Sequence, residues 1–227
     1  MAQQKDMSNS SLSHQTSETD HITIKRYSGP GIIQRWQTEM RLLQALQNQF
    51  PLPTLLEQSH EAEIHIRTLA GVPAADLITA ENSPLIMAAL GHALQKLQST
   101  PLQEMHNFLH GTGDILVHGD YCLPNFIFIS QPLTLEAIIE WEWAHLGDAV
   151  EDPSWMEWHI RMHMGKFVRD LPIFYEAYGI TPGWGERKDA MIMQVHRHLE
   201  FARMAGEKRA IQKWQNRLQI TSRYQAS

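Results

Sequence analysis

The chain has 227 residues, a formal net charge of -6, 43% hydrophobic residues and seven tryptophans. This composition predicts a packed globular core and excludes a disordered or low-complexity chain. No apolar run approaches the roughly 18 residues that span a bilayer, and residues 1–6 lack the apolar segment of a signal peptide. The single Cys122 cannot form an internal disulfide, which fits a reducing compartment. We therefore expect a soluble, cytoplasmic protein with no membrane partner.

The first seventy residues predict a small sheet with one helix. Residues 1–20 are polar and indicate a loop or a weak strand, whereas residues 21–27 alternate as a half-buried strand does. After a break at residues 29–31, apolar residues at three- and four-residue spacing predict a helix over residues 33–46. Two short strands are expected at residues 54–57 and 62–68.

The rest of the chain predicts a larger, mostly helical region behind a hinge at residues 69–73. Ser83 followed by Pro84 is typical of a helix start, so we expect one helix to Gln98 and another over residues 102–110. Apolar runs at 115–117, 126–129 and 135–139 predict short strands. From Asp152 onward the pattern favours helices broken near residues 165, 179–185 and 206. The fold class is therefore α+β.

The residues that indicate chemistry lie between these strands. His118-Gly119-Asp120 is followed by Asn125 and, after a further strand, by Glu140. Phosphoryl transfer uses one carboxylate to orient a hydroxyl and accept its proton, and an amide oxygen with another carboxylate to hold Mg²⁺. Taken alone, the His-Gly-Asp-Tyr segment is also what a simple turn between strands contains.

The pattern of His-Gly-Asp, four residues, Asn, and an acid after a strand resembles the aminoglycoside phosphotransferase and choline kinase group of small-molecule kinases. The segment 141–148, with Asp152 beyond it, is similar to the sequence that follows the metal-binding acid in that family. The resemblance implies the two-lobed, protein-kinase-like fold. We assign residues 1–70 to a reduced nucleotide-binding N-lobe and residues 71–227 to a C-lobe with the catalytic loops.

The resemblance also implies roles for individual residues. Asp120 is the expected catalytic base, Asn125 and Glu140 the magnesium ligands, and His118 a hydrogen-bonding support of the loop. Lys25, held by Glu39, is expected on the nucleotide phosphates. The remaining nucleotide contacts are expected from Ser10 and Ser11 in the N-terminal segment and from Thr68 and Ala70 at the hinge. The implied cofactors are ATP, or alternatively GTP, and Mg²⁺.

Two departures from the family pattern keep a second hypothesis open. Glu140 stands where the family has Asp, and the longer side chain displaces a carboxylate from a cation that demands strict octahedral geometry. No glycine-rich loop precedes Lys25, and the first strand of the lobe is predicted to be missing or very short. The alternative function is therefore a catalytically impaired pseudokinase that binds or regulates. We expect Glu142 to be a surface or structural carboxylate and Asp152 to accept backbone N–H bonds.

The charge distribution bears on the partner. Residues 97–160 hold ten Asp or Glu and no Lys or Arg, which argues against nucleic acid and favours a cationic or neutral small-molecule acceptor, such as an aminoglycoside. Alternatively, these acids only cap helices and solubilise one face. The six Lys or Arg of residues 201–227 are interpreted as a solvated helix face. The sequence does not determine the oligomeric state.

Two further patterns favour other chemistry. Cys122 with His118 raises the idea of a cysteine hydrolase, but a small buried Cys is the commoner case. His159 and His163 are four apart on an expected helix, which is a possible metal-binding spacing.

Overall fold

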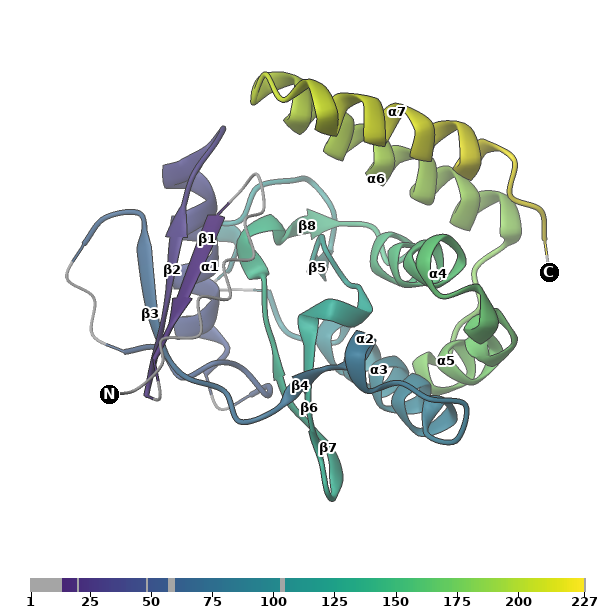
Figure 1. Cartoon of the computed structure of the whole chain (residues 1–227), viewed down its shortest axis with the longest axis horizontal. Coiled ribbons are helices and arrows are strands. Elements are labelled where there is room, and N and C mark those ends of the chain that lie inside the picture. Colours follow the sequence, from purple (N-terminus) through teal and green to yellow (C-terminus); the bar gives the residue numbers. More distant parts are fainter. Residues whose placement is uncertain (1–13, 20, 48, 57–59, 103–104, 227) are drawn as a thin grey trace.

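The computed structural model describes residues 14–19, 21–47, 49–56, 60–102 and 105–226. It has a small lobe of three strands and one helix and a larger, mainly helical lobe, as Figure 1 shows. The predicted α+β, two-lobed fold is therefore confirmed. No helix among the described residues is both long enough and apolar enough to cross a membrane.

The small lobe is an antiparallel sheet of β1 (His14–Glu18), β2 (Ile22–Tyr27) and β3 (Glu63–Arg67), in that order. Helix α1 (Ile32–Ala45) contributes Leu42 and Leu43 to the core. The prediction that the first strand is missing or very short is wrong, because β1 pairs with β2 over five residues. The strand expected at residues 54–57 is reduced to a single bridge between Leu55 and Ile66.

Short strands connect the two lobes. Strand β4 (Val72–Pro73) pairs with β6 (Phe126–Ser130), which pairs with β7 (Leu133–Ile138), and β5 (Ile115–Val117) pairs with β8 (His145–Gly147). Between them lie the short helix α2 (Ala74–Leu77) and the 3-10 turns η2 (Leu123–Asn125) and η3 (Trp141–Trp143). These short connections place the two acid-bearing segments next to each other.

The described residues of the segment 102–110, which are 102 and 105–110, do not form the expected α-helix. Only the 3-10 turn η1 (Met105–Asn107) appears in the described part of this segment. The backbone beyond it pairs with β8 instead: Leu146 donates to the carbonyl oxygen of His110 at 2.7 Å, and Gly111 bridges to Leu146. Periodicity alone does not show this competing backbone pairing.

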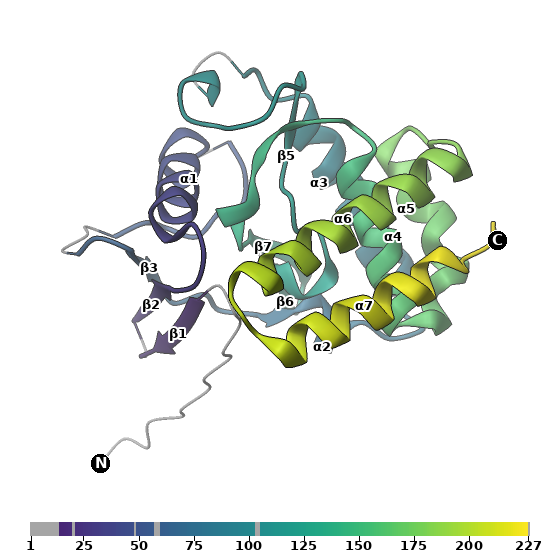
Figure 2. The ribbon, with the colours of Figure 1, turned by 90° about the horizontal axis from the view of Figure 1, so that it is seen from above.

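The large lobe follows the predicted helices and breaks. It contains α3 (Ser83–Gln98), α4 (Glu151–His163), the 3-10 turn η4 (Gly165–Asp170), α5 (Leu171–Tyr178), α6 (Trp184–Met204) and α7 (Lys208–Ser222). Helix α3 packs closely on α5, since a Cβ at Gly91 would lie 2.4 Å from the carbonyl oxygen of Phe174. Helices α6 and α7 form a hairpin beside α4 (Figures 1 and 2).

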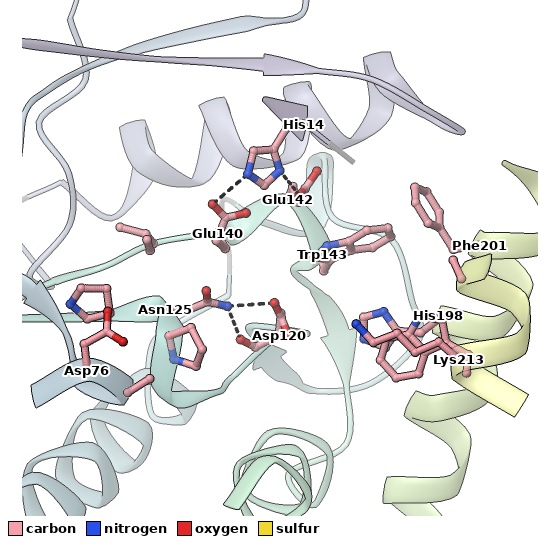
Figure 3. A pocket seen from close by; sticks show the side chains of 16 residues that line it. His14, Asp76, Asp120, Asn125, Glu140, Glu142, Trp143, His198, Phe201 and Lys213 are labelled. Atoms are coloured by element: carbon pink, nitrogen blue, oxygen red, sulfur yellow. Dashed lines mark hydrogen bonds and ion pairs between the residues drawn. The ribbon is translucent and has the colours of Figure 1, made fainter. Parts of the chain in front are cut away.

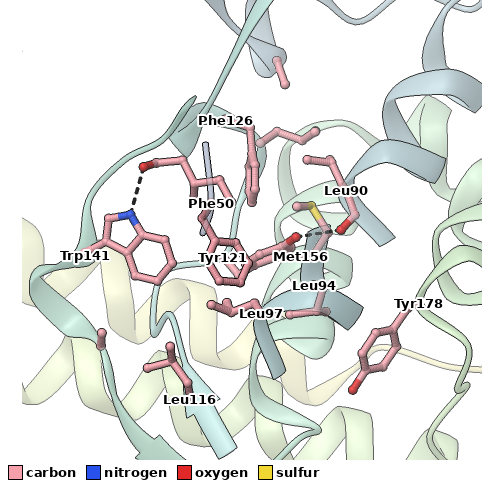
Figure 4. Packing of buried hydrophobic residues seen from close by; sticks show 14 of the residues in the cluster. Phe50, Leu90, Leu94, Leu97, Leu116, Tyr121, Phe126, Trp141, Met156 and Tyr178 are labelled. Atoms are coloured by element: carbon pink, nitrogen blue, oxygen red, sulfur yellow. Dashed lines mark hydrogen bonds between the residues drawn. The ribbon is translucent and has the colours of Figure 1, made fainter. Parts of the chain in front are cut away.

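The core beneath the catalytic loops is continuous with α3. Tyr121, Phe126 and Trp141 are fully buried in one cluster with Leu90, Leu94 and Leu97 of that helix. Figure 4 shows the packing of this cluster around Tyr121. The Tyr121 hydroxyl donates to the carbonyl oxygen of Leu90 at 2.7 Å. Because Tyr121 directly follows Asp120, this anchoring fixes the backbone that carries the expected base.

Candidate active site

The loop that carries Asp120 is shaped by a glycine and a buried acid. Gly119 has φ of 81°, and a Cβ there would lie 2.2 Å from the carbonyl oxygen of Trp143. Such a backbone conformation and so close an approach both require glycine. Asp152 accepts the backbone N–H groups of His118 and Gly119 at 2.7 and 3.0 Å, as predicted.

His118 supports the loop and is not placed for chemistry. Its Nδ1 accepts the backbone N–H of Asp120 at 3.2 Å, and its Nε2 lies 3.0 Å from the carbonyl oxygen of Ile139. Burial lowers the pKa of His118 to about 4, so the ring is neutral and donates from Nε2. The ring therefore connects the loop of Asp120 to the segment that leads into Glu140.

The Asp120 carboxylate is held by two side chains. The Asn125 amide donates to Asp120 Oδ2 at 2.8 Å, and the Trp155 indole N–H donates to Asp120 Oδ1 at 2.7 Å. Asn125 also donates to the Asp120 backbone carbonyl at 2.8 Å. One carboxylate thus receives donors from the following turn and from helix α4, which restricts its rotation.

Glu140 meets the small lobe. It has a left-handed backbone conformation, with φ of 69°, and lies next to two cationic side chains. Lys25 Nζ contacts Glu39 Oε2 at 2.7 Å and Glu140 Oε2 at 3.0 Å, and His14 Nε2 lies 3.3 Å from Glu140 Oε1. Lys25 and Glu39 therefore contact each other as predicted, and β1 supplies a histidine to the same group.

The charges in this group stabilise one another. Burial opposes ionisation of Glu140, but the Lys25 charge and the His14 hydrogen bond outweigh it and lower the pKa of Glu140. Burial also opposes the charge of His14, yet hydrogen bonds to Glu140 and Glu142 raise the pKa of His14 to about 9. Lys25 is buried as well, and Glu140 and Glu39 raise its pKa well above the usual range. Lys25, His14 and Glu140 therefore favour one another's charged forms, whereas burial raises the pKa of Glu39.

Glu142 is structural and not on the surface. Its side chain is buried, accepts from Arg35 of α1, and lies 3.1 Å from His14 Nδ1. A buried ion pair of this kind leaves an uncompensated charge if one partner is removed. Glu142 therefore ties α1 and β1 to the second acid-bearing loop.

A cavity of about 690 Å³ joins these groups. Asp120 and Asn125 lie at its centre in Figure 3, with Glu140 and His14 on one side and Asp76 on another. The opposite side is formed by side chains from η3, α6 and α7. The lining residues there are Trp143, His198, Phe201, Ala210, Lys213 and Trp214.

Several of these residues were not found by sequence reasoning. His14, Trp155 and His198 belong to no motif, and Lys213 and Trp214 fall in the segment interpreted as a solvated basic face. That interpretation is incomplete, because both line the cavity. The sequence signal for this face is Ile211, Trp214 and Leu218, at the three- and four-residue spacing of an apolar helix face.

The remaining predicted nucleotide contacts have different outcomes. Ser10 and Ser11 lie outside the described residues. Thr68 and Ala70 are not in the cavity lining, and the Thr68 hydroxyl donates to the carbonyl oxygen of Thr19 at 2.8 Å. Their nucleotide contact stays a prediction.

The two alternative chemistries gain no support from the geometry. Burial raises the pKa of Cys122, whose thiol lies 3.5 Å from Asp120 Oδ1, so it is not activated as a nucleophile. In the described part of the chain, three metal-binding side chains converge only at His14, Glu140 and Glu142, and His159 and His163 do not join such a group.

The residues present fit the divalent cation that the resemblance implies. Asn125 and Glu140 line one cavity with Asp120, and Figure 3 shows the Asn125 amide oxygen on the side of Glu140. Amide and carboxylate oxygens are the ligand types that Mg²⁺ prefers. The ionised Glu140 supplies the negative charge that such a site requires.

The family match covers the segment that carries Asp120, Asn125 and Glu140. Residues 112–190 match the model of a family described as the phosphotransferase enzyme family. No curated protein sequence matches the chain significantly.

Solved structures extend the likeness over both lobes. The GDP and kanamycin complex of APH(2")-IIia is similar with a TM-score of 0.76 and 12% identity, covering 94% of this chain and 91% of that one. The GDP complex of aminoglycoside 2'-phosphotransferase-IIIa has a TM-score of 0.74 and 10% identity, and the match covers 94% of this chain and 90% of that one. Macrolide 2'-phosphotransferase type I has a TM-score of 0.65 and 13% identity, and the match covers 92% of this chain and 89% of that one. Fold and family match together confirm the predicted resemblance to kinase-like phosphotransferases of small molecules.

Proposed function

We propose that this chain transfers the terminal phosphoryl group of ATP, or alternatively GTP, to a hydroxyl group of a small molecule, with Mg²⁺. The observation that carries the proposal is the placement of Asp120. Its carboxylate lines the cavity, is held by Asn125 and Trp155, and shares that cavity with Glu140. In phosphoryl transfer, one group acts as the base and other groups hold the metal ion, and these residues could divide the two roles in the same way.

The residues act as follows in this proposal. Asp120 orients the acceptor hydroxyl and accepts its proton as the oxygen attacks the terminal phosphorus atom, while the bond from that atom to the bridging oxygen breaks and ADP or GDP leaves. The Lys25 ammonium, held by Glu39, neutralises phosphate charge at the interface of the lobes. Asn125 and Glu140 hold Mg²⁺, which when bound supplies a positive charge at the phosphate oxygens.

A transfer assay tests the proposal. The protein is incubated with Mg-ATP labelled in its terminal phosphate and a panel of hydroxylated small molecules, and label on the acceptor is measured. Asp120→Asn is expected to lower turnover by about 10²–10⁴-fold, the usual contribution of a general base. Asp114→Asn serves as control, since Asp114 is exposed and lies outside the cavity lining. Turnover of Asp120→Asn within a few-fold of the parent contradicts the proposal.

A second function, nucleotide binding without transfer, is favoured by one contact pattern. Lys25 and His14 both contact Glu140, so the carboxylate expected on the cation already has two cationic partners. In the non-catalytic case, calorimetry detects Mg-ATP binding while no acceptor in the panel becomes labelled.

A further inference from the structure

Five of the ten acids in the block of residues 97–160 have cationic or backbone N–H partners within the fold. Glu140 and Glu142 contact Lys25, His14 and Arg35. Glu151 is paired with Arg197, Glu157 with Arg161 and Arg187, and Asp152 accepts backbone N–H groups. These cations come from segments on either side of the block in the sequence. These acids are therefore not unpaired carboxylates that could attract a cationic acceptor.

The side of the cavity formed by η3, α6 and α7 is aromatic. We call Trp143, His198, Phe201 and Trp214 the aromatic wall. His198 stacks on Trp214 with ring centroids 4.4 Å apart and an interplanar angle of 6°, and Trp143 meets Phe201 edge-on at 5.0 Å. His198 also stacks at 5.0 Å on Trp155, the residue whose indole holds Asp120. The wall is thus built directly onto the support of the expected base.

The charged side chain beside the aromatic wall is a lysine, which repels a polycation. Burial lowers the pKa of His198, so its ring is neutral. Lys213 lies next to Trp214 and lines the same side. The carboxylate that η3 adds to this side, Glu142, is buried and already paired with Arg35 and His14. Figure 3 shows Asp76 across the cavity with Asp120 between. A polyamine needs carboxylate partners, whereas a flat apolar ring needs a face to stack on.

We propose that the aromatic wall is the acceptor subsite and that the acceptor is an uncharged alcohol whose planar, apolar ring stacks on the wall while its hydroxyl reaches Asp120. This inference rests on the proposed function. Of the cationic and neutral acceptors that the sequence predicted, it chooses the neutral ones. A polycationic aminosugar is excluded as the preferred acceptor.

Binding of two probes, naphthylmethanol and kanamycin, tests the inference without turnover. The indole N–H signals of the seven tryptophans are recorded by NMR on labelled protein and assigned with single Trp→Phe variants. Naphthylmethanol is expected to shift the signals of Trp143, Trp155 and Trp214, which form or support the wall, and to leave Trp36 and Trp184 unchanged. Trp36 donates to the carbonyl oxygen of Glu63 in the small lobe, and neither residue lines the cavity.

Affinity measurements give a second criterion. Trp214→Ala is expected to weaken naphthylmethanol binding by about tenfold, since it removes an aromatic face, whereas Trp184→Ala keeps the parent affinity. The inference is overturned if kanamycin binds more tightly than naphthylmethanol, if neither probe binds, or if the shifts fall outside the wall. Mg-ATP binding, measured separately, reports on the proposed function, so that failure of the acceptor class and failure of nucleotide use remain distinguishable.

Discussion

Trp155→Phe isolates the contribution of one indole N–H to the orientation of the expected base. The change retains an aromatic ring in the stack with Trp158 and His198 but removes the donor that lies 2.7 Å from Asp120 Oδ1. The Asp120 carboxylate keeps the Asn125 donor on its other oxygen. We therefore expect a misoriented base in a folded protein.

The magnitude follows from the bond that is lost. A hydrogen bond to a charged group contributes about 1.5–3 kcal/mol, and each 1.4 kcal/mol or so corresponds to a tenfold change in rate. Part of this free energy is recovered by water, so kcat is expected to fall by about 10- to 100-fold. KM for the nucleotide should stay within about twofold, because Trp155 does not line the cavity and contacts neither Lys25 nor Glu140 in the hydrogen bonds of the site.

Trp158→Phe is the matched control. It removes an indole N–H from the same aromatic stack, but that group donates to the Thr221 hydroxyl at 2.7 Å and does not touch Asp120. Steady-state kinetics and thermal unfolding are measured on both variants. If both variants lose the same activity, the indole of Trp155 only contributes to packing and the reasoning is refuted.

Three further outcomes follow from the site and the fold. Glu140→Ala should weaken Mg-ATP binding in calorimetry, while Glu140→Asp preserves or improves it; equal affinity in all three proteins means that Glu140 is not a ligand. Glu151→Gln should lose about 2 kcal/mol of unfolding free energy at neutral pH. Burial opposes ionisation of Glu151, but His145 and the Asp148 N–H lower its pKa from 4.5 to about 2. Its contribution is therefore present above pH 4.5 and is lost as the pH falls toward 2, and denaturant titrations in which the gap between Glu151→Gln and parent stays constant over that range contradict the assignment. Gly119→Ala should lower Tm by several degrees, because a Cβ would meet the Trp143 carbonyl at 2.2 Å, whereas Gly165→Ala, with open space around it, should not.

The sequence by itself determined the local structure of the catalytic loop. Asp120 and Asn125 are five residues apart, so the turn between them brings amide and carboxylate together within one short segment. The start of α3 beside Pro84 and the helix end at Gly179, which has a left-handed backbone conformation, also follow from backbone conformational preferences. The Ser83 hydroxyl does not cap the helix but donates to Asp170 at 2.6 Å. The resemblance to a kinase family was visible because the motif is local.

The tertiary structure decided which distant side chains meet that loop. His14 reaches Glu142 across 128 residues, Arg35 reaches it across 107, and Trp155 reaches Asp120 across 35. Residues 105–110 do not continue the helix predicted over residues 102–110, and the backbone at His110 and Gly111 pairs with Leu146 of β8. Helix α7, interpreted as a solvated basic face, brings Trp214 to the cavity because α6 and α7 fold back as a hairpin. Periodicity and propensity describe a segment's own preferences, whereas these contacts depend on how whole elements pack, and packing is a property of the complete chain.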